Sequence, residues 1–320
     1  MTKAIERKQL LNTELQYFIE NKDNISVVVY ALVKGDDTPK KMDINPEAQG
    51  GLISLFLTKL KSTVIENEDL SILNLSSSDS RSKVIYYYDL DIPDELNAMN
   101  KVVETDDHEF FKVEEDGIDN IKVLLIEIGD HNKQIVLYKT MAPVNIFSKK
   151  HFFLKQSHSK FEKINDDFFR ISDNFQLIRT EKGIFIFELD IIEKNFGFHD
   201  VIKKEAALGI SAIRNKDILS NINELETLVS DVKYARKLTR VAKSSPVLSS
   251  NISNDKIIAF CQAYPALKNR IRFNPEKTKI MLDTKVSKDL FIKILMDDFL
   301  TSQLTDFYYE SVAKDEVENH

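Results

Sequence analysis

Hydrophobic residues follow two different spacings along this chain, and the change between them divides it into two parts. In the first part, apolar runs of strand length alternate with helical patterns. The clearest run, residues 24–34, is nearly continuous and rich in valine, which is typical of a buried strand. In the second part, apolar residues recur mainly at spacings of three and four, which favours helices. The pattern therefore predicts an α/β (α+β) protein of two lobes.

The first lobe is predicted to hold a mixed sheet with helices against it. A helix is expected after Gly50 and Gly51, and another near Pro93. Residues 142–150 lack a strong period, so we place the boundary near Phe147, between lobes of residues 1–146 and 147–320. The predicted strands of the first lobe are residues 24–34, 70–75, 84–90, 123–128 and 134–138, the last two forming a hairpin.

The second lobe is predicted to combine a small sheet with a larger helical part. Ser253 and Ser287 are expected to cap two of its helices. Hairpins are expected at residues 175–187 and 271–282, and helices at 199–213, 221–229, 233–243, 255–264 and 286–300. The buried face of the last helix should comprise Leu290, Phe291, Ile294, Leu295 and Phe299.

Residues 233–243 are the most informative short segment. On a helix, their basic side chains share one broad face, while Tyr234, Leu238 and Val241 form a separate apolar stripe. The segment contains no acid. Its five cations are Lys233, Arg236, Lys237, Arg240 and Lys243.

The charge of the chain is unevenly distributed. The formal net charge is −7, yet residues 233–293 hold 14 basic and four acidic residues, whereas residues 1–150 hold 26 acidic and 18 basic ones. Such a concentration of positive charge suggests an anionic partner such as a nucleic-acid backbone. Two alternatives are a solvated helix face and a contact between the basic region and an acidic domain or subunit.

A second basic cluster supports the nucleic-acid interpretation. Lys268, Arg270 and Arg272 flank apolar residues that include Phe273, and strand alternation would place the two arginines on one face. A solvated strand face is the alternative. Since no helix-turn-helix, zinc-finger or RRM signature is present, both clusters are expected to contact DNA phosphates without reading the base sequence.

The evidence for catalysis is weak. The eight glycines form neither a Walker A loop nor a GxGxxG fingerprint, and Ser211 lacks the closing glycine of a nucleophile elbow. Cys261 is the only cysteine and lies in an apolar helical pattern, so it should be core. Asp283 and Lys285, with Glu276 upstream, resemble the acid and lysine pattern of metal-dependent nucleases. That pattern is common by chance, so we expect no enzyme activity, metal or nucleotide cofactor.

The chain is expected to be cytoplasmic. It has no run of about 18 apolar residues, no signal-peptide core at its N-terminus and no terminal lipidation motif.

Two stretches resemble a known family. In residues 183–206, a short strand and a Phe-Glu pair precede an F-G-F element that leads into a helix. Residues 279–311 contain a strand, a helix with F-x-x-x-L, an acidic pair and an S-x-L-T segment followed by tyrosine. These features resemble the unknown-function domain of the KwaB family of the Kiwa anti-phage system, over roughly residues 147–311.

The resemblance implies a defence effector that binds DNA without an evident hydrolase site. It also implies work with KwaA, a multi-pass membrane partner, hence association with the inner membrane through that partner, and assembly as a homo-oligomer. No individual DNA contact carries over from the family. Three functions remain open: a DNA-binding effector, a metal-dependent nuclease using Asp283 and Lys285, and a protein-binding adaptor whose basic face docks on a partner.

Overall fold

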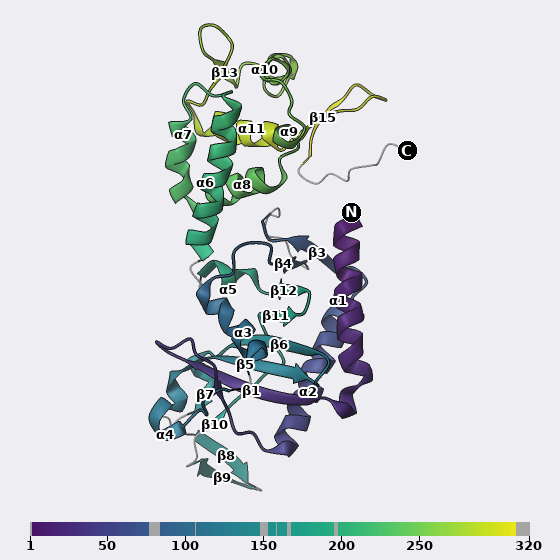
Figure 1. The fold of residues 1–320 in the computed structure, drawn as a ribbon, viewed down its shortest axis with the longest axis vertical. Helices are drawn as coiled ribbons and strands as arrows, with labels where there is room; N and C mark the ends of the chain where they lie inside the picture. Colours follow the sequence, from purple (N-terminus) through teal and green to yellow (C-terminus); the bar gives the residue numbers. More distant parts are fainter. Residues whose placement is uncertain are drawn as a thin grey trace.

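The protein is an elongated molecule with a sheet-containing lobe at one end and a helical lobe at the other (Figure 1). The computed structural model describes residues 2–76, 84–105, 107–147, 153–157, 159–164, 168–194 and 198–311. The predicted α/β class is confirmed, since helices accompany a mixed eight-stranded sheet within these residues.

The eight strands lie in the order β2-β1-β5-β6-β11-β12-β4-β3. Every neighbouring pair is antiparallel except β3 and β4, which are parallel, so the predicted mixed sheet is confirmed. The predicted hairpin of β5 and β6 is also present. In sheet order the bounds are Lys40–Lys41, Ser26–Val33, Ile121–Gly129, Gln134–Thr140, Leu177–Thr180, Gly183–Ile186, Val84–Tyr87 and Ser71–Asn74.

The hairpin of β11 and β12 forms as predicted, but it does not belong to a separate small sheet. It lies in the centre of the large sheet, where β11 pairs with β6 and β12 pairs with β4. Its side chains suit this position, because Leu177, Ile178, Phe185 and Ile186 are all buried. The sheet of the first lobe therefore continues to Ile186, whereas the domain boundary near Phe147 stays a prediction.

Alternating side chains of β1 serve two hydrophobic clusters. Val27 and Val29 face α1 (Thr2–Glu20) and α2 (Pro46–Leu60), whereas Tyr30 and Leu32 face α3 (Asp94–Glu104). The sequence did not predict α1. The placement of Gly50 and Gly51 before a helix was wrong, because α2 begins at Pro46, where the Asn45 side chain accepts a hydrogen bond from the Glu47 amide.

The helical lobe is built around α6 and α8, with α10 and α11 packed nearby (Figure 1). The small predicted hairpin is present as β13 (Arg272–Phe273) and β14 (Ile280–Met281). The other bounds are α5 Leu189–Lys194, α6 Phe198–Lys216, α7 Asn223–Glu226, α8 Val232–Ser244, α9 Pro246–Ser249, α10 Asn254–Ala263 and α11 Lys285–Leu295.

Two details of α11 differ from the prediction. The helix ends at Leu295, and the buried Phe299 instead begins a strand. Thr284, rather than Ser287, is the N-cap, and the two side chains form a reciprocal capping box. By contrast, Ser253 caps α10 as predicted, by accepting a hydrogen bond from the Lys256 amide.

Several short elements complete the described part of the chain. The hairpin β8–β9 lies at the far end of the sheet lobe, and the hairpin β15–β16 projects from the helical lobe (Figure 1). Within the described residues, no helix combines the length and apolar character needed to cross a membrane. The remaining bounds are α4 Val113–Asp116, β7 Ile146–Phe147, β8 Phe153–Ser157, β9 Lys160–Ile164, β10 Phe168–Phe169, β15 Phe299–Thr301 and β16 Tyr308–Glu310.

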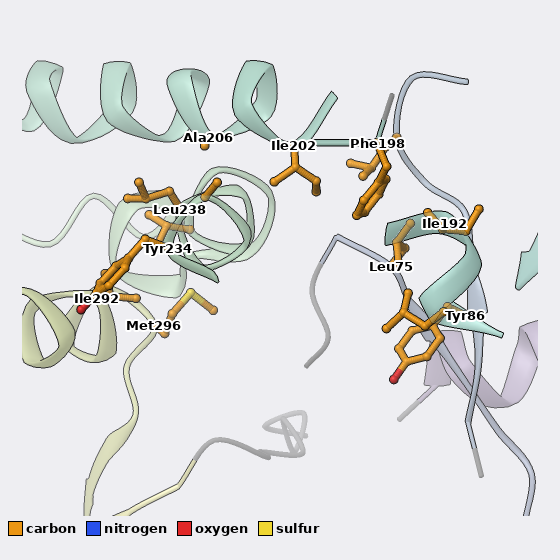
Figure 2. Close-up of a cluster of buried hydrophobic side chains, with 14 of the residues drawn as sticks. Leu75, Tyr86, Ile192, Phe198, Ile202, Ala206, Tyr234, Leu238, Ile292 and Met296 are labelled. Atoms are coloured by element: carbon orange, nitrogen blue, oxygen red, sulfur yellow. The ribbon is translucent and has the colours of Figure 1, made fainter. Parts of the chain in front are cut away.

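The two lobes share a continuous hydrophobic core. Figure 2 shows how side chains from the end of the sheet, including Leu75 and Tyr86, continue through Ile192 of α5 and Phe198 of α6 toward α8. Phe198 is the last residue of the F-G-F element; the two residues before it lie outside the described part of the chain. The core positions α8 at the junction of the lobes.

Candidate nucleic-acid interface

The basic segment forms a helix, α8, as predicted. Asp231 caps it: one carboxylate oxygen accepts hydrogen bonds from the amides of Lys233 at 2.9 Å and Tyr234 at 3.3 Å. The predicted apolar stripe is confirmed, since Tyr234, Leu238 and Val241 are all buried. The core thus fixes the rotation of α8 and with it the direction of its cations.

Close packing against α6 fixes the position of α8 as well. A Cβ atom added to Gly209 of α6 would lie 2.4 Å from the Leu238 carbonyl oxygen, so only glycine permits this approach. The Thr239 hydroxyl donates a hydrogen bond to the Ile202 carbonyl at 3.2 Å, and the Ser245 hydroxyl donates one to the Leu295 carbonyl at 2.6 Å. The helix is therefore held on two sides.

Four of the five predicted cations of α8 line one cavity between the lobes. We call this cavity the junction pocket. Its volume is about 220 Å³, and it is lined by Lys233, Arg236, Lys237 and Arg240 together with Leu75, Ser76 and Ile202. Leu75 comes from the segment after β3, and Ile202 comes from α6 (Figure 2). The pocket thus joins a cationic wall to a largely apolar one.

Ser76 is held in place behind the apolar wall. Its amide donates to one carboxylate oxygen of Asp89 at 2.9 Å, and its hydroxyl donates to the other at 2.5 Å. The residue is 5% exposed. The two hydrogen bonds fix the end of β3 and engage both oxygens of the only acid that contacts Ser76 in these bonds.

Two α8 lysines are paired with acids. The Lys237 ammonium lies 2.6 Å from a carboxylate oxygen of Asp289 on α11, and the Lys243 ammonium lies 2.9 Å from Glu205 on α6. Burial and then the charge of Asp289 raise the pKa of Tyr234 to about 12, so this phenol is neutral at physiological pH. Lys243 thus contributes to helix packing, whereas Lys237 remains 44% exposed at the pocket.

A further ion pair connects the lobes beside α8. The Lys204 ammonium on α6 donates to Asp91, which follows β4, at 2.7 Å. This hydrogen bond lowers the pKa of Asp91 and raises that of Lys204. Both side chains are largely exposed, so the pair contributes little stability, but it marks where the lobes meet.

The second predicted cluster lies away from the first. Lys268, Arg270 and Arg272 are exposed in the segment that leads into β13, at the end of the helical lobe opposite to α8 (Figure 1). Arg272 donates to Asp283 at 2.8 Å, and its side chain is 74% exposed. The structure therefore does not bring the two clusters together into one continuous basic face.

The candidate nuclease residues do not form a metal site in the described part of the chain. Asp283 is paired with Arg272, and Glu276 accepts a hydrogen bond from the Asn274 amide group at 2.8 Å. No group of three or more histidine, cysteine or acidic side chains that could hold a metal ion was found among the described residues. Lys285 is the first residue of α11.

The other catalytic candidates have structural surroundings. Ser211 lies within α6, where its hydroxyl donates to the Ala207 carbonyl at 3.0 Å. Cys261 is buried as predicted, and burial raises the pKa of its thiol to about 12, which opposes thiolate formation. Neither side chain has the arrangement of an activated nucleophile.

Sequence reasoning missed the apolar wall of the junction pocket. Leu75 and Ile202 were recognised only as members of a strand and a helix, since spacing alone does not reveal which distant elements meet. Ser76 begins a serine-rich stretch that was interpreted as a loop. No sequence signal linked these residues to α8.

Comparison with known proteins identifies relatives. A family model described as "Kiwa protein KwaB-like" matches residues 118–305. The chain is 27% identical to a protein named "Kiwa protein KwaB" from Escherichia coli O55:H7, strain RM12579 / EPEC, over 316 residues that cover 97% of this chain and 99% of that one. No solved structure matches significantly.

Proposed function

The chain belongs to the Kiwa protein KwaB-like family, and we propose that it is an anti-phage defence effector that binds DNA through α8. The observation that carries the proposal is the convergence of Lys233, Arg236, Lys237 and Arg240 on one pocket. Packing against α6 and α11 holds these cations near one another in a chain whose net charge is −7. Phosphate groups are the anions that neutralise such a cluster in nucleic-acid binding.

The proposal extends to the partners and location of the protein. Its family supports action together with a multi-pass membrane subunit, so the chain would sit in the cytoplasm against the inner membrane through protein contacts, as a homo-oligomer. DNA binding requires no catalytic residue, and we propose that the chain itself acts without hydrolysing DNA. If the isolated chain pelleted with neutral liposomes, attachment through a protein partner would be wrong.

Salt-dependent binding tests the central claim. In a variant with Arg236→Gln, Lys237→Gln and Arg240→Gln, glutamine keeps a polar side chain of similar length, so the fold should survive. Loss of three phosphate contacts should lower the magnitude of the log–log salt slope for duplex DNA by about 2.7 and weaken binding at least about tenfold. Unrelated sequences should lose affinity equally, because phosphates carry no base code.

A matched variant controls for net charge. Lys22, Lys61 and Lys101 are exposed lysines of the sheet lobe, and their replacement by glutamine removes the same charge. This control should change the slope by less than about 0.9, the value for one contact. Equal loss in both variants would show that overall charge, rather than α8, controls binding. An unmodified protein that binds no DNA would refute the proposal.

A specific observation also favours the protein-binding alternative. The hairpin β15–β16 exposes a group of apolar side chains, among them Leu304 at 93% and Phe307 at 64% exposure. Exposed apolar patches often mark contacts with other proteins. Replacing both residues by serine should weaken capture of the membrane subunit and leave DNA affinity unchanged. If capture persists, the hairpin is not the contact surface.

A further inference from the structure

We propose that the junction pocket binds a terminal phosphate of a nucleotide, rather than the side of a DNA duplex. This inference rests on the proposed DNA binding and narrows its ligand. The chemistry required is a phosphomonoester attached to a nucleoside, and two sources could supply it: the end of a DNA strand or a free nucleotide.

The size and shape of the pocket carry the first step. A duplex presents its phosphates on a convex surface, with one charge per about 1.7 Å of its axis. The junction pocket is concave and has a volume of about 220 Å³. Cavities for drug-sized ligands start at roughly 300 Å³, so this one suits a single phosphate with part of its sugar.

The charge within the pocket carries the second step. Four cations converge there, and Asp289 is the acid paired with one of them, Lys237. A backbone phosphodiester carries one negative charge, whereas a phosphomonoester carries about −1.5 to −2 at pH 7. The greater charge and the third free oxygen of a monoester match a site with two guanidinium groups and two ammonium groups.

The two arginines supply geometric selectivity. A guanidinium group can donate two parallel hydrogen bonds to one phosphate, which an ammonium group cannot do. Arg236 and Arg240 lie one helical turn apart on α8, so both side chains reach the same cavity. Lys233 has no ion pair within the described residues and lies exposed at this surface, where it would add charge.

The opposite wall supplies a place for the nucleoside. Leu75 and Ile202 are each 2% exposed and present apolar surface to the cavity from different lobes (Figure 2). The sugar or base attached to the phosphate would pack against this wall. A ligand that spans the cavity would therefore contact α8, α6 and the end of β3 at once.

The test compares DNA molecules that differ only at their ends. The probes are a 12-nucleotide single strand with a 5′-phosphate, the same strand with a 5′-hydroxyl, and a covalently closed single-stranded circle. The unmodified protein should bind the phosphorylated strand at least about tenfold more tightly than the other two, a typical effect of additional charge-assisted hydrogen bonds.

The decisive variant is Arg236→Lys with Arg240→Lys, which keeps the charge and removes both guanidinium groups. It should lose the preference for the phosphorylated end and bind the circle within about twofold of the unmodified protein. Arg270→Lys, in the exposed second cluster, is the matched control and should retain the preference. A thermal melt shows whether each variant is folded.

The outcomes separate this inference from the proposed function. Equal binding of all three probes would overturn the terminal-phosphate inference and leave DNA binding intact. If no probe binds, both fail. Free thymidine monophosphate is added as a competitor: displacement at a concentration similar to that of the phosphorylated strand supports the inference with a free nucleotide as source, and weak displacement supports it with DNA ends. A double-lysine variant that keeps the preference would overturn it.

Discussion

The two cation clusters of the helical lobe differ in how the fold holds them. On α8, the cations stand on a helix whose opposite stripe is buried, and four of them surround one pocket. Lys268, Arg270 and Arg272 instead lie exposed in a connecting segment and the short strand that follows it. The comparison indicates that the first cluster can position a ligand, whereas the second can mainly attract one.

Disrupting the seat of α8 should give the largest effect. In Gly209→Val, the new side chain would collide with the Leu238 carbonyl, 2.4 Å from the Cβ position. Overpacking of this kind should lower the free energy of unfolding by about 3 kcal/mol and displace the α8 cations. Chemical denaturation measures the loss, and binding of the 12-nucleotide strand should fall with it.

Gly51→Val is the matched control for that experiment. Gly51 also lies within a helix, α2, but its Cβ position has open space around it. Stability should therefore stay within about 1 kcal/mol of the unmodified protein, since valine and glycine differ little in helix propensity. Equal losses in the two variants would contradict a special role for the contact between α6 and α8.

A third basic site shows what complete burial does to a cation. Lys139 on β6 is 1% exposed, and its ammonium donates to neutral oxygens, including the Asn174 carbonyl at 2.7 Å and the Ser172 hydroxyl at 3.0 Å. Burial lowers its pKa from 10.5 to about 8. Unlike the α8 cations, this lysine loses its charge in mildly alkaline solution.

The pH dependence of stability tests this contrast. Between pH 8 and pH 10.5, Lys139 releases its proton in the folded protein but keeps it in the unfolded chain, so rising pH should favour the folded state. The gain should reach about 2–3 kcal/mol over that window. Lys139→Met should lack this gain in denaturation experiments at pH 7.5 and 10. Identical pH profiles would show that the pKa of Lys139 is not lowered.

The sequence predicted the elements of the cationic site better than their meeting point. The α8 residues and their apolar stripe followed from three- and four-residue spacing, and most strands followed from apolar runs. The partners of those elements did not, because local spacing carries no information on long-range pairing. The hairpin of β11 and β12 was therefore assigned to the wrong sheet, and Leu75 and Ile202 were not connected with α8.

The expectation of one basic C-terminal face failed for the same reason. Residues 233–243 and 268–272 are close in sequence, but the helices α9 and α10 intervene and carry the chain to the other end of the lobe (Figure 1). The helix α1 was missed because its polar residues outweigh its apolar ones, although Leu11, Leu15 and Phe18 form a buried stripe. A weak average concealed a clear helical period.

Neutralising the exposed cluster should have a moderate effect on DNA binding. A variant with Lys268→Gln, Arg270→Gln and Arg272→Gln should weaken duplex binding less than about tenfold, and the salt slope should fall by less than about 2.7 because not every cation meets a phosphate. Stability should change by less than about 0.5 kcal/mol, as is usual for exposed positions. The preference for a 5′-phosphate should persist. Loss of that preference would place end recognition in this cluster.

The smallest effect is expected when Lys237 is freed from Asp289. The pair lies 2.6 Å apart with both side chains partly exposed, so Asp289→Asn should cost less than about 1 kcal/mol of stability. Removing the acid makes the junction pocket more positive, and affinity for the phosphorylated strand should rise about twofold. The pKa of Tyr234 should also fall, because the Asp289 charge helps to raise it. Glu226→Gln, which frees Arg214 on α6, is the control and should leave affinity unchanged. A loss of affinity in Asp289→Asn would show that the carboxylate orients Lys237 toward its ligand, and the pocket would then depend on the geometry of that pair more than on its net charge.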